Sequence, residues 1–387
     1  MSRKIYLDNA ATTRVKKEVI DEMRSYFDEM YGNPSSQLYE LGRKSKEAIE
    51  NARHTVAEFI NADDKELYFT AGGTESDNWA IKGVAFANKK KGNHIITTKI
   101  EHHAVIHTCE YLEKFGFETT YLDVDKHGMI DLEQLKSSIR PETILISVMY
   151  ANNEIGTIQP IEKIGEIAHE HGIIFHTDAV QALGGVRINV KKQHIDLMSM
   201  SAHKVGGPKG IGGMYIRKGV KIDNFIHGGG QERGKRAGTE GVQNIVGFGK
   251  AIELVQRDFD EHVEKLTAMR NKLIEGITSN IPDIVLNGHP TARLPNNVNF
   301  SYRYVEGESI LLLLDMEGIS ASSGSACTSG SLDPSHVLLA TGLDHGTAHG
   351  SIRFTLSEET TEEDIDFVIE TMKKIIEKLR KISPLNK

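Results

Sequence analysis

The sequence is poor in cysteine, and this scarcity limits its chemistry. Cys109 and Cys327 are the only two cysteines among 387 residues. A disulfide framework is therefore excluded, and the chain alone cannot supply the four thiolates that hold an iron–sulfur cluster. The cysteine content instead favours chemistry at a single thiol.

Long hydrophobic runs are also missing. No apolar stretch approaches the roughly 20 residues of a membrane span, and residues 1–4 lead into no signal-peptide core. We therefore expect a cytoplasmic protein without a membrane partner. The net charge of −8 argues against a broad nucleic-acid surface, and the short basic run at residues 89–91 is expected to be a solvated helix end.

The chain is long enough for two domains, and its first two thirds alternate helical patterns with short apolar runs. This alternation predicts a mainly parallel sheet with helices on both faces and ligands at the carboxyl ends of its strands. Expected helices cover residues 42–60, 78–87, 103–115 and 161–171, and expected strands cover residues 67–70, 95–98, 144–149 and 173–176.

The last third has a different texture. One long helical pattern at residues 244–280 leads to Pro282. A shorter α+β segment follows, and its expected elements are a strand at 297–301 and helices at 308–317 and 361–381.

A lysine and an aspartate follow two apolar segments. Lys204 comes after the segment 196–200, and Asp178 closes an earlier apolar segment. Each residue alone has an ordinary explanation, as a surface lysine or a turn residue. Together, at the ends of neighbouring strands, an amine and a carboxylate are what pyridoxal 5'-phosphate (PLP) chemistry needs.

A glycine turn follows the expected strand 67–70. Gly72 and Gly73 precede Thr74, Ser76 and a helical pattern. A strand, a glycine turn and a helix start present free backbone N–H groups to an anion such as phosphate. The alternative is an ordinary helix capped by Thr74 or Ser76.

These segments, in this order, resemble the cysteine desulfurases, which are PLP enzymes of the class V aminotransferase group and take sulfur from L-cysteine. The resemblance runs nearly end to end. Besides the lysine and aspartate segments, it is carried by residues 6–13, 31–36, 74–78, 101–102, 152–156, 227–232, 236–239, 322–327 and 351–354.

The resemblance implies an α/β fold of PLP fold type I. We expect a large PLP-binding domain at residues 15–255, with a mainly parallel sheet of the seven-stranded type flanked by helices. We expect a small α+β domain from residues 1–14 and 256–387, which carries a mobile loop around Cys327.

The resemblance also implies roles at the cofactor. Lys204 corresponds to the lysine that bonds PLP covalently, and Asp178 to the carboxylate that keeps the pyridine nitrogen protonated. His102 corresponds to the histidine stacked on the ring, and Gln181 to the side chain bonded to the phenolic oxygen. The residues implied at the phosphate are Gly73, Thr74, Ser201 and His203, with the partner subunit's Thr239.

The last assignment implies a homodimer. Gly241 stands where related sequences usually have asparagine, and Tyr39 where they often have histidine. The first departure predicts a more mobile loop around Thr239.

At the substrate, Asn153 and Arg353 correspond to residues that hold the carboxylate of L-cysteine. Cys327 lies among small residues that fit a mobile loop and corresponds to the thiol that accepts sulfur as a persulfide. The sulfur would pass to an iron–sulfur scaffold or another acceptor protein, with tRNA thiolation as a further destination. The sequence leaves open whether Cys327 also ligates a transient iron–sulfur cluster shared with a scaffold.

Alternative readings remain at this point. A selenocysteine lyase on the same fold, or a sulfur or cluster scaffold without catalysis, fits parts of the pattern. A scaffold without catalysis needs none of Lys204, Asp178 and His102, so their presence argues against it.

The four-residue spacing of His103 and His107 suggests a zinc site, but no suitably spaced third ligand or carboxylate completes the set. Cys109 is expected on an apolar helix face.

Overall fold

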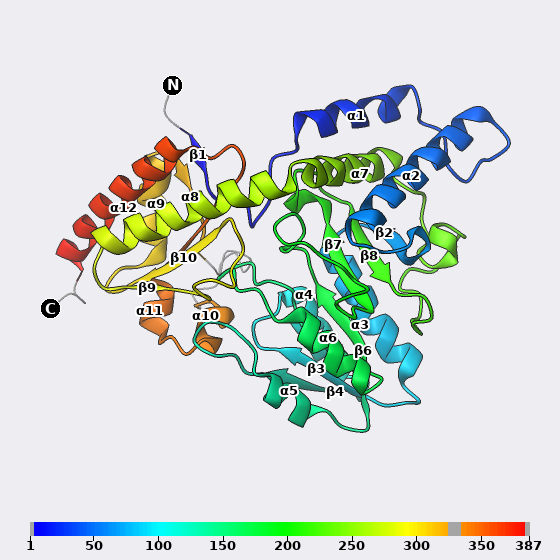
Figure 1. The fold of residues 1–387 in the computed structure, drawn as a ribbon, viewed down its shortest axis with the longest axis horizontal. Helices are drawn as coiled ribbons and strands as arrows, with labels where there is room; N and C mark the ends of the chain where they lie inside the picture. The colour runs from blue at the N-terminus through cyan, green and yellow to red at the C-terminus, as the bar shows by residue number, and fades with distance from the viewer. Residues whose placement is uncertain (1–3, 324–333, 384–387) are drawn as a thin grey trace.

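The computed structural model describes residues 4–323 and 334–383. Figure 1 shows two lobes side by side, and the larger lobe is built on a seven-stranded sheet. Its strand order is β2-β8-β7-β6-β5-β3-β4, and β8 alone runs against the other strands of this sheet. The strands are β2 (Leu67–Thr70), β3 (His94–Thr98), β4 (Glu118–Leu122), β5 (Thr143–Ser147), β6 (Ile174–Asp178), β7 (Leu197–Ser201) and β8 (Gly212–Ile216).

Helices cover both faces of this sheet. Neighbouring strand residues point to opposite sides, so Ile95 joins the core beneath α3 and α4 while Ile96 joins the core beneath α2, α6 and α7. The helices are α1 (Lys17–Asp28), α2 (Glu40–Phe59), α3 (Gly73–Asn88), α4 (His103–Glu113), α5 (Leu132–Ser138), α6 (Ile161–Glu170) and α7 (Val242–Arg257). The expected α/β fold class is confirmed.

The smaller lobe has its own core. An antiparallel sheet in the order β12-β10-β9 packs with α8 and α12, and β1 pairs with β11. Ile5 and Leu7 belong to this core although they lie at the start of the chain. The elements are β1 (Ile5–Tyr6), α8 (Phe259–Asn280), β9 (Ile284–Leu286), β10 (Asn297–Tyr302), α9 (Gly307–Met316), β11 (Ile319–Ser320), α10 (His336–Ala340), α11 (His345–His349), β12 (Ser351–Thr355) and α12 (Glu362–Ile382). The domain boundaries expected from the sequence stay a proposal.

The single long helix expected at residues 244–280 is wrong. Asp258 leaves helical geometry, with φ −110° and ψ 16°, and separates α7 from α8. The two helices belong to different hydrophobic cores, because α7 packs on α1 and α2, whereas α8 packs on α12. In Figure 1, α8 extends from the end of α7 into the smaller lobe. Within the described residues, no helix is both long and apolar enough to span a bilayer.

Candidate active site

Four predicted residues gather at the carboxyl ends of the parallel strands. Asp178 ends β6, and Ser201 ends the neighbouring β7. A single 3-10 turn, Ala202–Lys204, then carries the chain to Lys204. His102 follows β3, and both His102 and Lys204 lie close enough to act electrostatically on Asp178. The expected grouping of amine, carboxylate and imidazole is present.

The side chain of Asp178 is a buried carboxylate that accepts a hydrogen bond from the backbone. The backbone N–H of Val180 donates to its Oδ1 at 2.9 Å. Burial raises the pKa of Asp178, while His102, the Val180 N–H and Lys204 oppose this rise. A cationic ring nitrogen placed against this carboxylate would supply the counter-charge that burial demands.

His102 is held in one orientation by the helix that follows it. It is the N-cap of α4, and its Nδ1 accepts a hydrogen bond from the backbone N–H of Ala104 at 3.1 Å. The neutral ring therefore carries its proton on Nε2. Burial lowers the pKa of His102, which favours this neutral form.

The glycine turn forms an uncapped helix start. Gly72 has φ +151°, and no side chain caps the first turn of α3. A methyl group on Gly73 would lie 2.7 Å from Val180 and 3.9 Å from Ser201 Cβ, so the end of β7 lies beside the turn. Ser76 instead bonds Thr70 at 2.8 Å, and the capped-helix alternative is therefore wrong. The free N–H groups and Ser201 suit a phosphate.

The N-terminal segment, residues 8–13, crosses over these groups, a contact that its expected place in the small domain did not predict. The Lys204 ammonium donates to the Ala10 carbonyl, and Gln181 Nε2 donates to the same oxygen at 2.9 Å. The His203 ring Nδ1 lies 3.2 Å from a threonine hydroxyl of the segment. Burial, with Lys204 nearby, lowers the pKa of His203 to about 4. The advance signals were the small, polar composition of residues 8–13 and their place in the family motif at residues 6–13.

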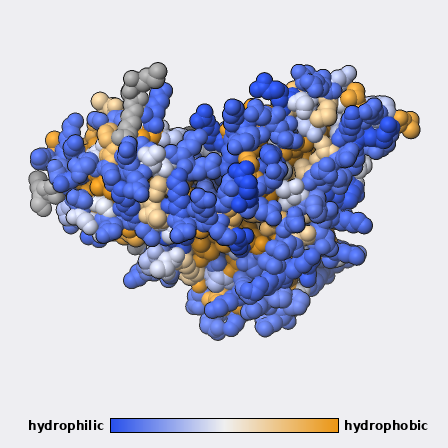
Figure 2. Space-filling view, turned by 45° about the horizontal axis from the view of Figure 1, so that its top comes forward, coloured by the Kyte–Doolittle hydropathy of each residue, from blue (hydrophilic) through white to orange (hydrophobic). Residues whose placement is uncertain are grey.

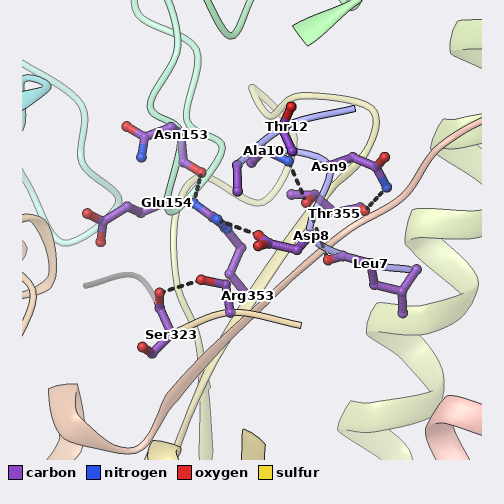
Figure 3. A network of polar contacts seen from close by, with 12 residues as sticks. Leu7, Asp8, Asn9, Ala10, Thr12, Asn153, Glu154, Ser323, Arg353 and Thr355 are labelled. Atoms are coloured by element: carbon purple, nitrogen blue, oxygen red, sulfur yellow. Dashed lines mark hydrogen bonds and ion pairs between the residues drawn. The ribbon is translucent and has the colours of Figure 1, made fainter. Parts of the chain in front are cut away.

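Arg353 extends from β12 toward the same segment (Figure 3). Its Nη1 donates to the Asn153 carbonyl at 3.0 Å, and its Nη2 donates to Asp8 Oδ1 at 2.8 Å. The structure thus brings Arg353 and Asn153 together through the main chain of Asn153. A role for the Asn153 side chain at a carboxylate stays a prediction.

A large cavity opens between the two lobes beside these residues. Its volume is about 1110 Å³, and Lys204, Gln181 and Thr12 are among its lining residues. On the face shown in Figure 2, apolar residues gather in the hollow between the lobes, within a mostly hydrophilic surface. Asp178, His102 and Arg353 are not among the lining residues, so the cavity borders the candidate site on the side of Lys204 and does not enclose it.

Two predicted residues stand apart from this grouping. Thr239 is exposed, on the loop that precedes α7. Cys327 lies outside the described residues. Ser322 and Ser335 flank that stretch, and Ser322 exchanges two backbone hydrogen bonds with Arg353 while Ser335 donates to the Glu154 carboxylate. The sequence analysis also missed Glu154.

The surroundings of Cys109, and of the His103 and His107 pair, fit a structural role. Cys109 is buried in α4 among apolar residues, and burial raises the pKa of its thiol. The rings of His103 and His107 stack at 4.9 Å, with His336 at 4.7 Å from His103. Residues 4–323 and 334–383 contain no group of three His, Cys, Asp or Glu side chains arranged to hold a metal.

The donor set fits PLP. It combines a lysine amine, a buried carboxylate, a fixed neutral imidazole and an uncapped helix start within one group of strand ends. A metal ion would need converging anionic or imidazole ligands, whereas a pyridinium phosphate needs a carboxylate at one end and N–H groups at the other.

Comparison with known proteins agrees with this geometry. Residues 5–368 match the Aminotransferase class-V family. The chain is 59% identical over 387 residues to cysteine desulfurase IscS from Clostridium botulinum, covering 100% of this chain and 97% of that protein. A NifS-like protein structure superposes with a TM-score of 0.91 at 38% identity, covering 97% of this chain and 100% of that chain.

A second solved structure, described as SspA in complex with cysteine, has a TM-score of 0.82 at 38% identity, covering 92% of this chain and 100% of that chain. The match to the family extends over both lobes and includes every described residue of the candidate site. The chain belongs to the class V aminotransferase family, among its cysteine desulfurases.

Proposed function

We propose that this protein is a PLP-dependent cysteine desulfurase that converts L-cysteine to L-alanine and donates the sulfur for iron–sulfur cluster assembly. The observation that carries the proposal is the grouping of Lys204, Asp178 and His102 at the carboxyl ends of β7, β6 and β3 in one sheet. This grouping occurs in a chain that is 59% identical over its whole length to a cysteine desulfurase.

The proposed cofactor site uses residues of both the strands and α3. Lys204 would bond PLP, Asp178 would hold the ring nitrogen, and His102 would stack on the ring. The phosphate would be bound by Gly73, Thr74, Ser201 and His203. Bound PLP withdraws electrons from the α-carbon of an amino acid and so makes its proton acidic.

The chain's own residues would then divide the work. Arg353 would bind the substrate carboxylate, and the Lys204 amine would take the α-proton. The Cys327 thiolate would attack the substrate sulfur, so that a sulfur–sulfur bond forms as the carbon–sulfur bond breaks. The electron pair stays with the carbon, which gains a proton to give alanine.

The proposal also includes a homodimer and a sulfur acceptor. A homodimer would bring the partner subunit's Thr239 to the phosphate, and the exposure of Thr239 supports this. Apolar side chains exposed near α1 and α2, Phe27, Tyr31, Leu38 and Tyr39, offer surface for a second copy. The sulfur acceptor would be an iron–sulfur scaffold or another protein in the same cytoplasmic compartment.

The direct test is production of alanine and sulfide from L-cysteine by the purified protein with a thiol reductant. Cys327→Ser should bind PLP and L-cysteine but release almost no sulfur, because a hydroxyl cannot supply the attacking anion. Cys109→Ser is the matched control and should keep most turnover. Mass spectrometry that finds the added sulfur on Cys109, or full turnover of Cys327→Ser, would reverse these roles.

Covalent attachment provides a second test. After borohydride reduction, PLP should be found on Lys204 and should be absent from Lys204→Ala. Comparing turnover of L-cysteine and L-selenocysteine separates the desulfurase from a selenocysteine lyase. A non-catalytic scaffold would release no alanine from either substrate.

A further inference from the structure

Arg353 carries a buried charge, and Asp8 carries the opposite charge beside it. The Arg353 side chain is 3% exposed, and the Asp8 carboxylate lies 2.8 Å from its Nη2. A guanidinium keeps its proton at every relevant pH, so a buried arginine needs an anionic partner. Glu154 also acts electrostatically on Arg353, but burial raises the pKa of Glu154 to about 7. Among the described residues, Asp8 is the acid that forms an ion pair with Arg353.

The backbone on each side of Asp8 is fixed to β12, the strand that carries Arg353. Thr355 N donates to Leu7 O at 2.7 Å, and Asn9 Nδ2 donates to Thr355 O at 2.7 Å. Ala10 N donates to Thr355 Oγ1 at 2.8 Å. Figure 3 shows these contacts running along the segment toward Arg353. These hydrogen bonds hold the backbone of Asp8 in place beside β12. The backbone of Asp8 therefore cannot move away from Arg353 unless the bonds to Thr355 break.

Among the described residues, the Arg353 guanidinium donates hydrogen bonds to two fixed acceptors. Asn153 O holds Nη1 and Asp8 Oδ1 holds Nη2, which fixes the plane of the group. Its Nε is buried and has no hydrogen-bond partner among the described residues. Arginine has five N–H donors, so those not used by Asp8 and Asn153 can meet another carboxylate.

We propose that Asp8 is the positioning residue of the substrate-carboxylate site: it fixes the plane of the Arg353 guanidinium so that the remaining N–H groups face the carboxylate of the amino-acid substrate. This inference rests on the proposed function, in which Arg353 binds that carboxylate. Asp8 touches neither substrate nor cofactor in this role, and it acts through Arg353.

The test compares two amines that differ by one carboxylate. L-Alanine and ethylamine are titrated into the holoenzyme, and the change in cofactor absorbance gives each dissociation constant. Asp8→Ala should weaken L-alanine binding about tenfold or more, because the guanidinium loses its orientation, and should leave ethylamine binding unchanged. Asp8→Asn removes the charge but keeps a hydrogen-bond acceptor of the same shape, so it should lose less L-alanine affinity than Asp8→Ala.

A matched control removes a carboxylate from another ion pair with the N-terminal region. Glu359 pairs with Arg14 at 3.3 Å, and their side chains are 63% and 81% exposed. Glu359→Ala should leave both dissociation constants unchanged. Thermal unfolding of each variant establishes that the fold is intact before binding is compared.

Arg353→Gln separates the inference from the function on which it rests. If Arg353→Gln keeps the wild-type preference for L-alanine over ethylamine, the carboxylate assignment itself is wrong. If Arg353→Gln loses that preference while Asp8→Ala retains it, the function stands and the role of Asp8 is refuted. Tighter L-alanine binding by Asp8→Ala would also refute it, since Asp8 would then compete with the substrate carboxylate.

Discussion

Asp77 is a second buried carboxyl group near Asp178, and its surroundings favour its uncharged form. It is 1% exposed, and its Oδ1 has no hydrogen-bond partner among the described residues. Burial and the like charge of Asp178 raise the pKa of Asp77 well above its usual value. A single negative charge on this pair, at Asp178, is what a cationic ring nitrogen requires.

Replacement by the neutral isostere should therefore distinguish the two acids. Asp77→Asn should retain PLP with an affinity within about threefold of wild type, because it replaces an uncharged group. Asp178→Asn should lose at least about tenfold in affinity, because it removes the counter-charge. PLP affinity is measured by absorbance after equilibrium dialysis. Equal losses in both variants would contradict this division of charge.

Glu101 makes the stability of the protein depend on pH. Its carboxyl accepts hydrogen bonds from Thr98 Oγ1 at 2.8 Å and Met149 N at 2.9 Å, yet burial raises its pKa from 4.5 to about 8. Between these two values the folded chain binds more protons than the unfolded chain. The contribution of Glu101 is therefore complete below pH 4.5 and is lost as the pH rises to about 8.

Glu101→Gln should remove this dependence. Relative to wild type, the free energy of unfolding of the variant should rise with pH, by at most about 1.4 kcal/mol per pH unit. Urea unfolding at pH 5.5 and pH 7.5, both inside the window, measures the change. A difference between variant and wild type that is the same at both pH values would refute the assignment.

At the scale of elements, a buried ion pair anchors the loop that carries Thr239. The Arg53 guanidinium on α2 donates twice to Glu232 at 2.8 Å, and Phe69 N of β2 donates to the same carboxylate at 2.9 Å. Glu232 and Arg233 have φ values of 45° and 55°, which disfavour residues other than glycine. The strained turn persists because the Glu232 carboxylate is bound by α2 and by β2.

Glu232→Ala should destabilise the protein by about 1.5–3 kcal/mol, because the buried Arg53 guanidinium loses two charged hydrogen bonds and keeps only Glu50, at 3.2 Å, as an acidic partner. The Arg187–Asp260 pair is a suitable comparison, since its side chains are 62% and 83% exposed. Asp260→Ala should cost less than about 1 kcal/mol. Denaturant unfolding of the two variants checks both values, and equal losses would show that the Glu232 pair is no anchor.

Elements set by local sequence were predictable, and those set by distant partners were not. The strand at Leu67–Thr70 has the predicted bounds, because a glycine turn ends it. The helix expected from residue 78 begins at Gly73. Glycine has a low helix propensity, so no signal in the sequence marked this earlier start, which depends on tertiary packing. Lys204 and Asp178 could be proposed from the sequence because each lies at or just beyond the end of its own apolar segment. The pairing of Asp8 with Arg353 was missed, because no spacing rule connects residues 345 positions apart.

At the scale of the whole molecule, the proposed dimer should be visible in cofactor retention. Thr239→Ala should weaken PLP binding by up to about tenfold, the value of one hydrogen bond to phosphate. Coexpression with Lys204→Ala should restore tight binding at half of the sites in mixed dimers. Each restored site would combine Lys204 of one subunit with the partner subunit's Thr239. No recovery in purified mixed dimers would contradict a contact across subunits.

The pairing of residues near the start of the chain with β12 has a consequence for synthesis on the ribosome. Asn9 bonds a residue 346 positions later, so a nascent chain must wait for almost its whole length before this contact can form. At about 5–20 residues per second, that wait is roughly 20 seconds or more. The contact between the N-terminal segment and Arg353 is thus among the last to be assembled. A ribosome stalled before β12 would display a chain that lacks Arg353, the residue proposed to bind the substrate carboxylate.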